Sequence, residues 1–114
     1  MSLPEFTIGI EEEYQIIDPE TRELRSYIQE FLEQGQMILK DQIKPEMLQS
    51  QVEVGSQICR NIQEARQELV RLRSSIADLA SQNGLEVAAA STHPFSRWSE
   101  QQVTDLDRYY KHEE

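Results

Sequence analysis

The chain has 114 residues with 21 acidic and 11 basic side chains, which give it a formal net charge of −10. A chain of this length has room for one domain with one modest core, and its excess of negative charge argues against nucleic-acid binding, because affinity for phosphate backbones comes from Lys and Arg. The single cysteine, Cys59, cannot form an internal disulfide, and no apolar run is long enough for a membrane span. Residues 1–4 lack the basic and apolar regions of a signal peptide. From these three observations we expect a cytoplasmic protein.

The first predicted element is a strand over residues 6–17, where apolar and polar side chains alternate. The alternation puts Glu11 and Glu13 on one face, roughly 7 Å apart along the strand. Two carboxylates this close repel each other unless a cation lies between them, and Glu is itself a poor strand former. Hard oxygen ligands on a rigid strand suit Mg²⁺ or Mn²⁺, so the pair indicates a metal site. A solvated acidic face on an edge strand is the alternative.

Residues 18–21, Asp-Pro-Glu-Thr, are typical of a turn, because Pro is favoured at its second position. Ser26 and Gln29 then form a capping-box signature, which predicts that a helix begins here. Gly35 is a weak point near the middle of this helix, and Lys44–Pro45 ends the region. The apolar stripe of the helix consists of Ile28, Phe31, Leu32, Ile38 and Leu39.

A second strand is predicted over residues 48–54, again with alternating side chains. Gln51 and Glu53 share its polar face. If this strand neighbours the first, three carboxylates and an amide converge on one sheet surface, an arrangement that builds metal sites. The alternative is that Glu53 only pairs with a surface arginine such as Arg60.

The next predicted element is a helix from about Asn61 to Gln82. Asn61 with Glu64 is a helix-start signal, and Asn83-Gly84 is a stop signal. We expect its apolar stripe to pack on the sheet face that carries Ile8, Ile10 and Val52. That stripe consists of Ile62, Ala65, Leu69, Leu72, Ile76 and Leu79.

Three further elements complete the predicted fold. Residues 85–90 are nearly all small or apolar, which predicts a short strand buried on both faces. His93-Pro94-Phe95 follows as a turn, and Thr104-Asp105 is a cap for a final helix. The sequence has no Gly-rich phosphate loop and no Cys/His zinc cluster, and a Ser/His/Asp nucleophile would rest on His93 alone, so we do not favour one.

Three segments together resemble one known family. Residues 6–21 are similar to the amino-terminal strand of the ATP-dependent carboxylate–amine ligases related to the second bacterial type of glutamate–cysteine ligase. Residues 48–55 resemble the second signature of that family, and residues 91–95, followed by Trp98, resemble the third. The resemblance implies an α+β fold, namely part of a glutamine-synthetase-like catalytic domain over residues 1–114, with a mostly antiparallel sheet and helices on one face.

The resemblance also implies a reaction and a set of metal ligands. In that family ATP phosphorylates a carboxylate, here expected to be that of glutamate, and an amine such as cysteine then displaces phosphate from the acyl phosphate. Glu11, Glu13 and Glu53 correspond to carboxylates that hold the divalent metals, Mg²⁺ or Mn²⁺, between ATP and substrate. Glu12 points to the other face, and we interpret it as structural, neutralised by an arginine.

Other site residues follow from motif position and charge. Gln51 and His93 are expected to bind substrate, with a purely structural role in the turn as the alternative for His93. Arg108 is a candidate for binding the nucleotide phosphates. Cys59 is expected to be a packed small residue and not a nucleophile.

The chain departs from the family in length, because family members are much longer. We therefore expect a fragment or a truncated homologue that holds at best half of a metal site and does not turn over alone. Unpaired sheet edges would favour a homo-oligomer. Two other classes of protein stay open, a non-catalytic metal- or partner-binding module and a structural dimerising α+β domain.

Overall fold

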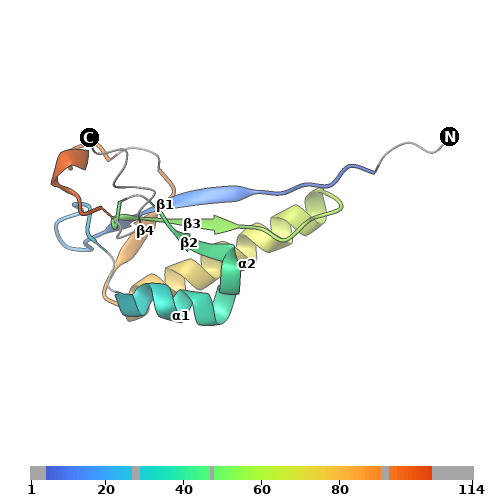
Figure 1. The fold of residues 1–114 in the computed structure, drawn as a ribbon, viewed down its shortest axis with the longest axis horizontal. Coiled ribbons are helices and arrows are strands. Elements are labelled where there is room, and N and C mark those ends of the chain that lie inside the picture. The colour runs from blue at the N-terminus through green and yellow to red at the C-terminus, as the bar shows by residue number, and fades with distance from the viewer. Residues whose placement is uncertain (1–4, 27–28, 47, 91–92, 104–114) are drawn as a thin grey trace.

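A computed structural model describes residues 5–26, 29–46, 48–90 and 93–103. Four antiparallel strands form one sheet in the order β2-β3-β1-β4, and the two helices lie on the same side of it (Figure 1). This confirms an α+β fold with an antiparallel sheet and helices on one face. The elements are β1 (Glu11–Ile17), α1 (Gln29–Leu39), β2 (Ile43–Pro45), β3 (Gln51–Gly55), α2 (Ile62–Gln82) and β4 (Glu86–Ala88), with 3-10 turns at Lys40–Gln42 and Trp98–Glu100.

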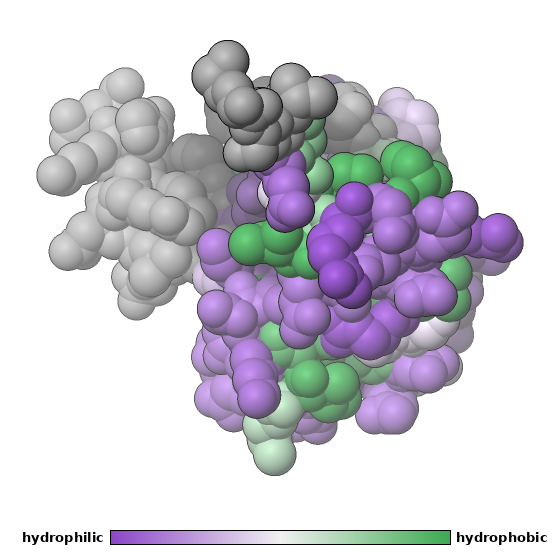
Figure 2. Space-filling view, turned by 90° about the vertical axis from the view of Figure 1, so that its right-hand side faces the viewer, coloured by the Kyte–Doolittle hydropathy of each residue, from purple (hydrophilic) through white to green (hydrophobic). Residues whose placement is uncertain are grey.

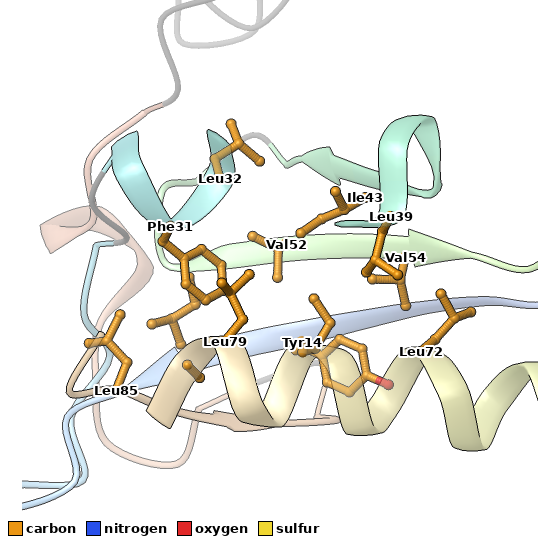
Figure 3. Packing of buried hydrophobic residues seen from close by; sticks show 13 residues of the cluster. Tyr14, Phe31, Leu32, Leu39, Ile43, Val52, Val54, Leu72, Leu79 and Leu85 are labelled. Carbon is orange, nitrogen blue, oxygen red and sulfur yellow. The ribbon is translucent and has the colours of Figure 1, made fainter. Parts of the chain in front are cut away.

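The core lies between the sheet and the two helices, as Figure 3 shows. β1 and β3 send alternate side chains into it, so that Tyr14, Ile16 and Val52 are at most 4% exposed. α2 contributes Leu72 and Ile76, both at most 1% exposed. The predicted packing of this helix on the Val52 face is therefore confirmed.

Both ends of α2 have the predicted local chemistry. The Asn61 Oδ1 accepts a hydrogen bond of 2.9 Å from the Glu64 backbone N–H, which satisfies one of the free donors of the first turn. Gly84 follows the helix with φ of +68°, a conformation that side chains rarely adopt. Ile62 is 71% exposed, so its place in the apolar stripe was wrong and the buried stripe begins at Ala65.

α1 packs against α2 and β2 through Phe31, Leu32 and Leu39, which are buried as predicted. Ile38 is 60% exposed, so its predicted burial was wrong, and Ile28 lies outside the described residues. Gly35 is buried, and a Cβ atom there would lie 2.7 Å from the Ile43 Cδ1. Gly35 therefore permits the close approach of α1 to β2, which is more than a weak point in the helix.

The edge strands differ from the predictions. Lys44–Pro45 was predicted to end the first helical region, but residues 43–45 form β2. Pro45 can lie in this edge strand because no partner needs its missing N–H. The third predicted strand shortens to β4, and its predicted burial on both faces was wrong because β4 is itself an edge with Glu86 exposed. The predicted helix at Thr104 lies outside the described residues.

The surface agrees with the acidic, polar composition. Hydrophilic side chains cover most of the face in Figure 2, and the hydrophobic ones form separate small patches. Within the described part of the chain, neither helix combines the length and the apolar character needed to cross a membrane.

Candidate metal-binding face

The two acidic strands are neighbours, and their register brings the predicted carboxylates together. β1 pairs antiparallel with β3 so that Glu13 lies directly opposite Glu53, and Glu11 lies two residues along β1, opposite Gly55. Side chains alternate along each strand, so all three carboxylates leave the sheet on the face away from the helices. We call Glu11, Glu13 and Glu53 on this surface the acidic face.

The three carboxylates have no neutralising partner among the described residues. None of them makes an ion pair or a side-chain hydrogen bond there, and the alternative partner for Glu53, Arg60, pairs instead with Glu64. Opposite side chains in an antiparallel pair have Cβ atoms only about 5 Å apart, and like charges at that position destabilise the sheet. An oxygen-rich surface with unpaired negative charge is chemically suited to a divalent cation.

The three carboxylates are on the same face of the sheet, but they are not arranged around one common point. In the described ranges, no three His, Cys, Asp or Glu side chains form a group that could hold a metal ion. This agrees with the expectation that the chain holds at best half of a metal site, and metal binding by these carboxylates stays a prediction. Glu11 and Glu13 are exposed and Glu53 is half-buried, so flexible side chains and a ligand from elsewhere would have to complete any such site.

A cavity of about 530 Å³ opens at one end of the acidic face, lined by Glu11, Glu53 and Asp41 together with Lys44 of β2. Lys44 lies directly opposite Glu53 in the β2–β3 pairing. On the other side of the acidic face, a hollow of about 300 Å³ is bordered by Ala89 and Ala90, whose small side chains leave room beside the glutamates. Lys44 was not predicted as a site residue, because the sequence pattern placed Lys44 and Pro45 at the end of a helical region.

Glu12 lies on the helix side of β1 and is neutralised by an arginine, as interpreted from the sequence. Arg73 of α2 donates two hydrogen bonds to its carboxylate, from Nε at 2.9 Å and from Nη2 at 2.6 Å. The Tyr14 hydroxyl donates a third, at 2.6 Å. The bonds from Arg73 lower the pKa of Glu12, while burial and the carboxylate beside it raise the pKa of Tyr14 to about 12.

The remaining predicted site residues are more dispersed. Gln51 lies two residues before Glu53 on β3, so its side chain is on the same side of the sheet as the acidic face. It is half-buried. His93 uses both ring nitrogens within the fold, since Nε2 contacts the Arg22 carbonyl oxygen at 2.7 Å and Nδ1 accepts from the Ser96 N–H at 3.0 Å. These contacts match the turn-forming alternative, and substrate binding by either residue stays a prediction. Arg108 lies outside the described residues.

Cys59 is 1% exposed, and its backbone pairs with that of Ile8 in an isolated antiparallel β-bridge. The prediction that Cys59 is a packed residue is therefore confirmed.

A second charged cluster fixes the chain just after Glu53. Glu68 of α2 accepts hydrogen bonds from Arg71, from the Gln57 N–H at 2.9 Å and from Gln42 Nε2 at 3.2 Å. Gln42 also donates to the Gly55 carbonyl oxygen, at the end of β3. These bonds, chiefly the one from Arg71, lower the pKa of Glu68 to about 2.

Glu68 therefore makes a prediction about acid stability. A depressed pKa contributes stability above the pKa of the unfolded chain, near 4.5, and this contribution is lost as the pH falls toward about 2. Glu68→Gln places an amide N–H₂ against other donors, and we expect it to cost about 1–2 kcal/mol at pH 7. Urea unfolding should show that the difference from wild type narrows between pH 5 and pH 3.

The matched control is Glu33→Gln, at an exposed position of α1. It should leave the free energy of unfolding within about 0.5 kcal/mol of wild type. A Glu68→Gln deficit that is the same at pH 7 and pH 3 would contradict an ionised, hydrogen-bonded Glu68.

Comparisons with known proteins cover almost the whole chain. The model of glutamate–cysteine ligase family 2 matches residues 7–114. A protein of Herpetosiphon aurantiacus is 62% identical over 105 residues, and one of Chloroflexus aurantiacus is 64% identical over 105 residues; each match covers 92% of this chain and 27% of the relative. A protein of Sorangium cellulosum is 53% identical over 107 residues. All three are named as putative glutamate–cysteine ligase 2, and this chain spans about a quarter of their length.

Proposed function

Because this chain belongs to glutamate–cysteine ligase family 2, we propose that it is part of a longer ATP- and magnesium-dependent ligase with a glutamine-synthetase-like catalytic sheet. The relatives carry the name of a ligase that joins glutamate to cysteine. For this protein we propose glutamate as the carboxylate and cysteine, or a similar amine, as its acceptor.

One observation supports metal binding by particular residues of this chain: Glu13 lies opposite Glu53, and Glu11 is on the same face. This arrangement costs stability in the absence of a cation. A divalent metal held there would neutralise the anionic phosphates and the substrate carboxylate and orient them. We propose Glu11, Glu13 and Glu53 as carboxylates that hold it, completed by ligands from the rest of the enzyme.

The proposed reaction has two steps. A carboxylate oxygen of glutamate attacks the γ-phosphorus of ATP, and ADP leaves with the electron pair of the broken P–O bond. The amine nitrogen then attacks the acyl carbon, loses its proton and displaces inorganic phosphate. In this scheme Lys44, on the wall of the cavity, is available to pair with a phosphate or carboxylate oxygen, and Gln51, His93 and Arg108 remain the proposed contacts to substrate and nucleotide.

Location and assembly belong to the same proposal. A single buried cysteine is compatible with the reducing cytoplasm. The sheet ends in two short edge strands, β2 and β4, whose free backbone groups could pair with further chain or with a second copy. We therefore propose a cytoplasmic homo-oligomer, and we expect this chain by itself not to hydrolyse ATP.

Linked binding of metal and nucleotide tests the proposal. Because the rest of the enzyme is proposed to complete the site, Mn²⁺ binding is measured on the full-length enzyme, by electron paramagnetic resonance with and without a non-hydrolysable ATP analogue. A ligase site predicts that the analogue tightens Mn²⁺ binding, and by reciprocity that Mn²⁺ tightens binding of the analogue. AMP, which lacks the β- and γ-phosphates, is the matched control and should have no such effect.

The other outcomes identify the alternatives. Mn²⁺ binding that the analogue leaves unchanged would indicate a non-catalytic metal-binding module. If Mn²⁺ does not bind at all, a structural dimerising domain becomes the better description and the ligase proposal fails for this chain.

A further inference from the structure

β1, which carries two of the proposed metal ligands, makes strong contacts on its helix-facing side. Glu12 lies between Glu11 and Glu13 in β1 but faces the helices, where Arg73 contacts both of its carboxylate oxygens at 2.9 and 2.6 Å. The Tyr14 hydroxyl binds the same carboxylate at 2.6 Å. Three hydrogen bonds from two elements therefore converge on the one residue that separates the two ligands.

The chemistry of this cluster favours a fixed geometry. A planar guanidinium that binds both oxygens of a carboxylate fixes distance and orientation together, which a single hydrogen bond does not. The Glu12 side chain is 16% exposed, against 56% for Arg73, so the carboxylate end is the more shielded from water. Because successive residues of a strand share one rigid backbone, holding Glu12 against α2 also holds the backbone of Glu11 and Glu13.

Stability alone is a weak reason for the cluster. Glu12 lies opposite Val54 in the β1–β3 pairing, at the border of the apolar core. Replacing a shielded ion pair by apolar side chains of similar size is often neutral or stabilising. Because the guanidinium of Arg73 contacts both oxygens of Glu12, the pair is better suited to setting the position of the strand than to adding stability.

We propose that Arg73, through Glu12, is a positioning residue for the acidic face: it fixes β1 against α2, so that Glu11 and Glu13 are held beside Glu53 as carboxylates that would contribute to holding a divalent cation. This inference rests on the proposed metal-binding function. It assigns to α2 a role in that site although the helix lies on the opposite side of the sheet from it (Figure 1).

The proposal and simple electrostatics predict opposite effects for the same variant. Arg73→Met removes a positive charge and leaves the Glu12 carboxylate unpaired close to the acidic face. If only charge mattered, a divalent cation would then bind more tightly. If Arg73 positions the strand, the cation should bind about 10-fold more weakly, as when outer partners of metal ligands are removed.

The experiment compares Arg73→Met with Arg66→Met. Arg66 lies on the same helix, is exposed, and has no ion pair within the described residues, so its replacement changes the net charge equally. The dissociation constant for Mn²⁺ is measured by electron paramagnetic resonance on the full-length enzyme that carries these substitutions, and the amide hydrogen exchange of Glu11–Glu13 is measured by NMR. We expect weaker binding and faster exchange in Arg73→Met only. Equal or tighter Mn²⁺ binding would overturn the proposal.

A second variant separates positioning from folding. Glu12→Met combined with Arg73→Met leaves no unpaired charge and should fold at least as stably as wild type, yet its Mn²⁺ binding should still be weakened. A stable double variant with wild-type affinity would overturn the proposal. If wild type itself binds no Mn²⁺, the proposed function fails, while the exchange rates of Glu11–Glu13 in Arg73→Met still decide whether the cluster holds the strand.

Discussion

We expect Leu72→Asp to leave the domain unfolded at room temperature. Leu72 is 1% exposed and lies on the sheet side of α2, among the core side chains in Figure 3. Losing the burial of this side chain costs ~1.5–3 kcal/mol, and placing a carboxylate in the same apolar site adds a desolvation cost of several kcal/mol. Native domains are stable by only ~5–15 kcal/mol, and one of this size has a modest core.

Circular dichroism and the dispersion of the amide NMR spectrum measure the result. Val70→Asp is the matched control, because Val70 is on the same helix but is 58% exposed. It should retain a cooperative thermal transition with a midpoint close to that of wild type. A folded Leu72→Asp protein would mean that the face of α2 assigned to the core is wrong.

Glu13→Gln has two opposite effects, one on the fold and one on the metal. Glu13 lies opposite Glu53 without a neutralising partner in the described residues, so removing its charge relieves cross-strand repulsion. We expect the metal-free domain to gain about 0.5 kcal/mol, or roughly 3 °C in its thermal midpoint. The same substitution removes a proposed ligand, so the rise in midpoint that Mn²⁺ gives wild type should disappear.

Glu53→Gln gives an internal comparison. Glu53 lies between Glu13 and Lys44. It makes no ion pair with Lys44 but is attracted to it at longer range, so replacing Glu53 loses a weak attraction together with a repulsion. It should abolish the Mn²⁺ effect as Glu13→Gln does, while its gain in metal-free stability should be smaller. Differential scanning fluorimetry of wild type and both variants, each with and without Mn²⁺, measures the six midpoints. A Glu13→Gln protein that is less stable than wild type and still responds to Mn²⁺ would contradict both roles.

The parts of the fold that were predictable are those where local chemistry and periodicity agree. α2 has an Asn61 cap, a regular apolar stripe and a Gly84 stop, and its predicted core positions were right apart from Ile62, which is exposed, and Leu69, which is only half-buried. The outer turn of a helix extends past the sheet, so an apolar residue there has nothing to pack against. Short edge strands were less predictable, because three residues such as Ile43–Pro45 are too few to display an alternating pattern.

The acidic face followed from strand parity, which needs only the period of two. The sequence could not say that Glu13 lies directly opposite Glu53, because register depends on how two distant segments pair. It anticipated an arginine for Glu12 but not that Arg73 supplies it, since that contact joins residues 61 positions apart. Lys44 was missed because its strand was missed, and recognising the Ile43-Lys44-Pro45 edge would have revealed it.

The alternation of β1 also determines which changes in chain length the protein can tolerate. Deleting Glu12 alone, with Tyr14 held in the core, would carry Glu11 to the side facing Arg73 and turn Ile10 toward the acidic face. Deleting two adjacent residues would preserve the sidedness of everything that precedes them. The exposed turn around Thr21 has no such restriction. Variants that still fold should therefore have an even number of residues inserted or deleted within β1. In the turn that follows β1, insertions and deletions of any length should be tolerated.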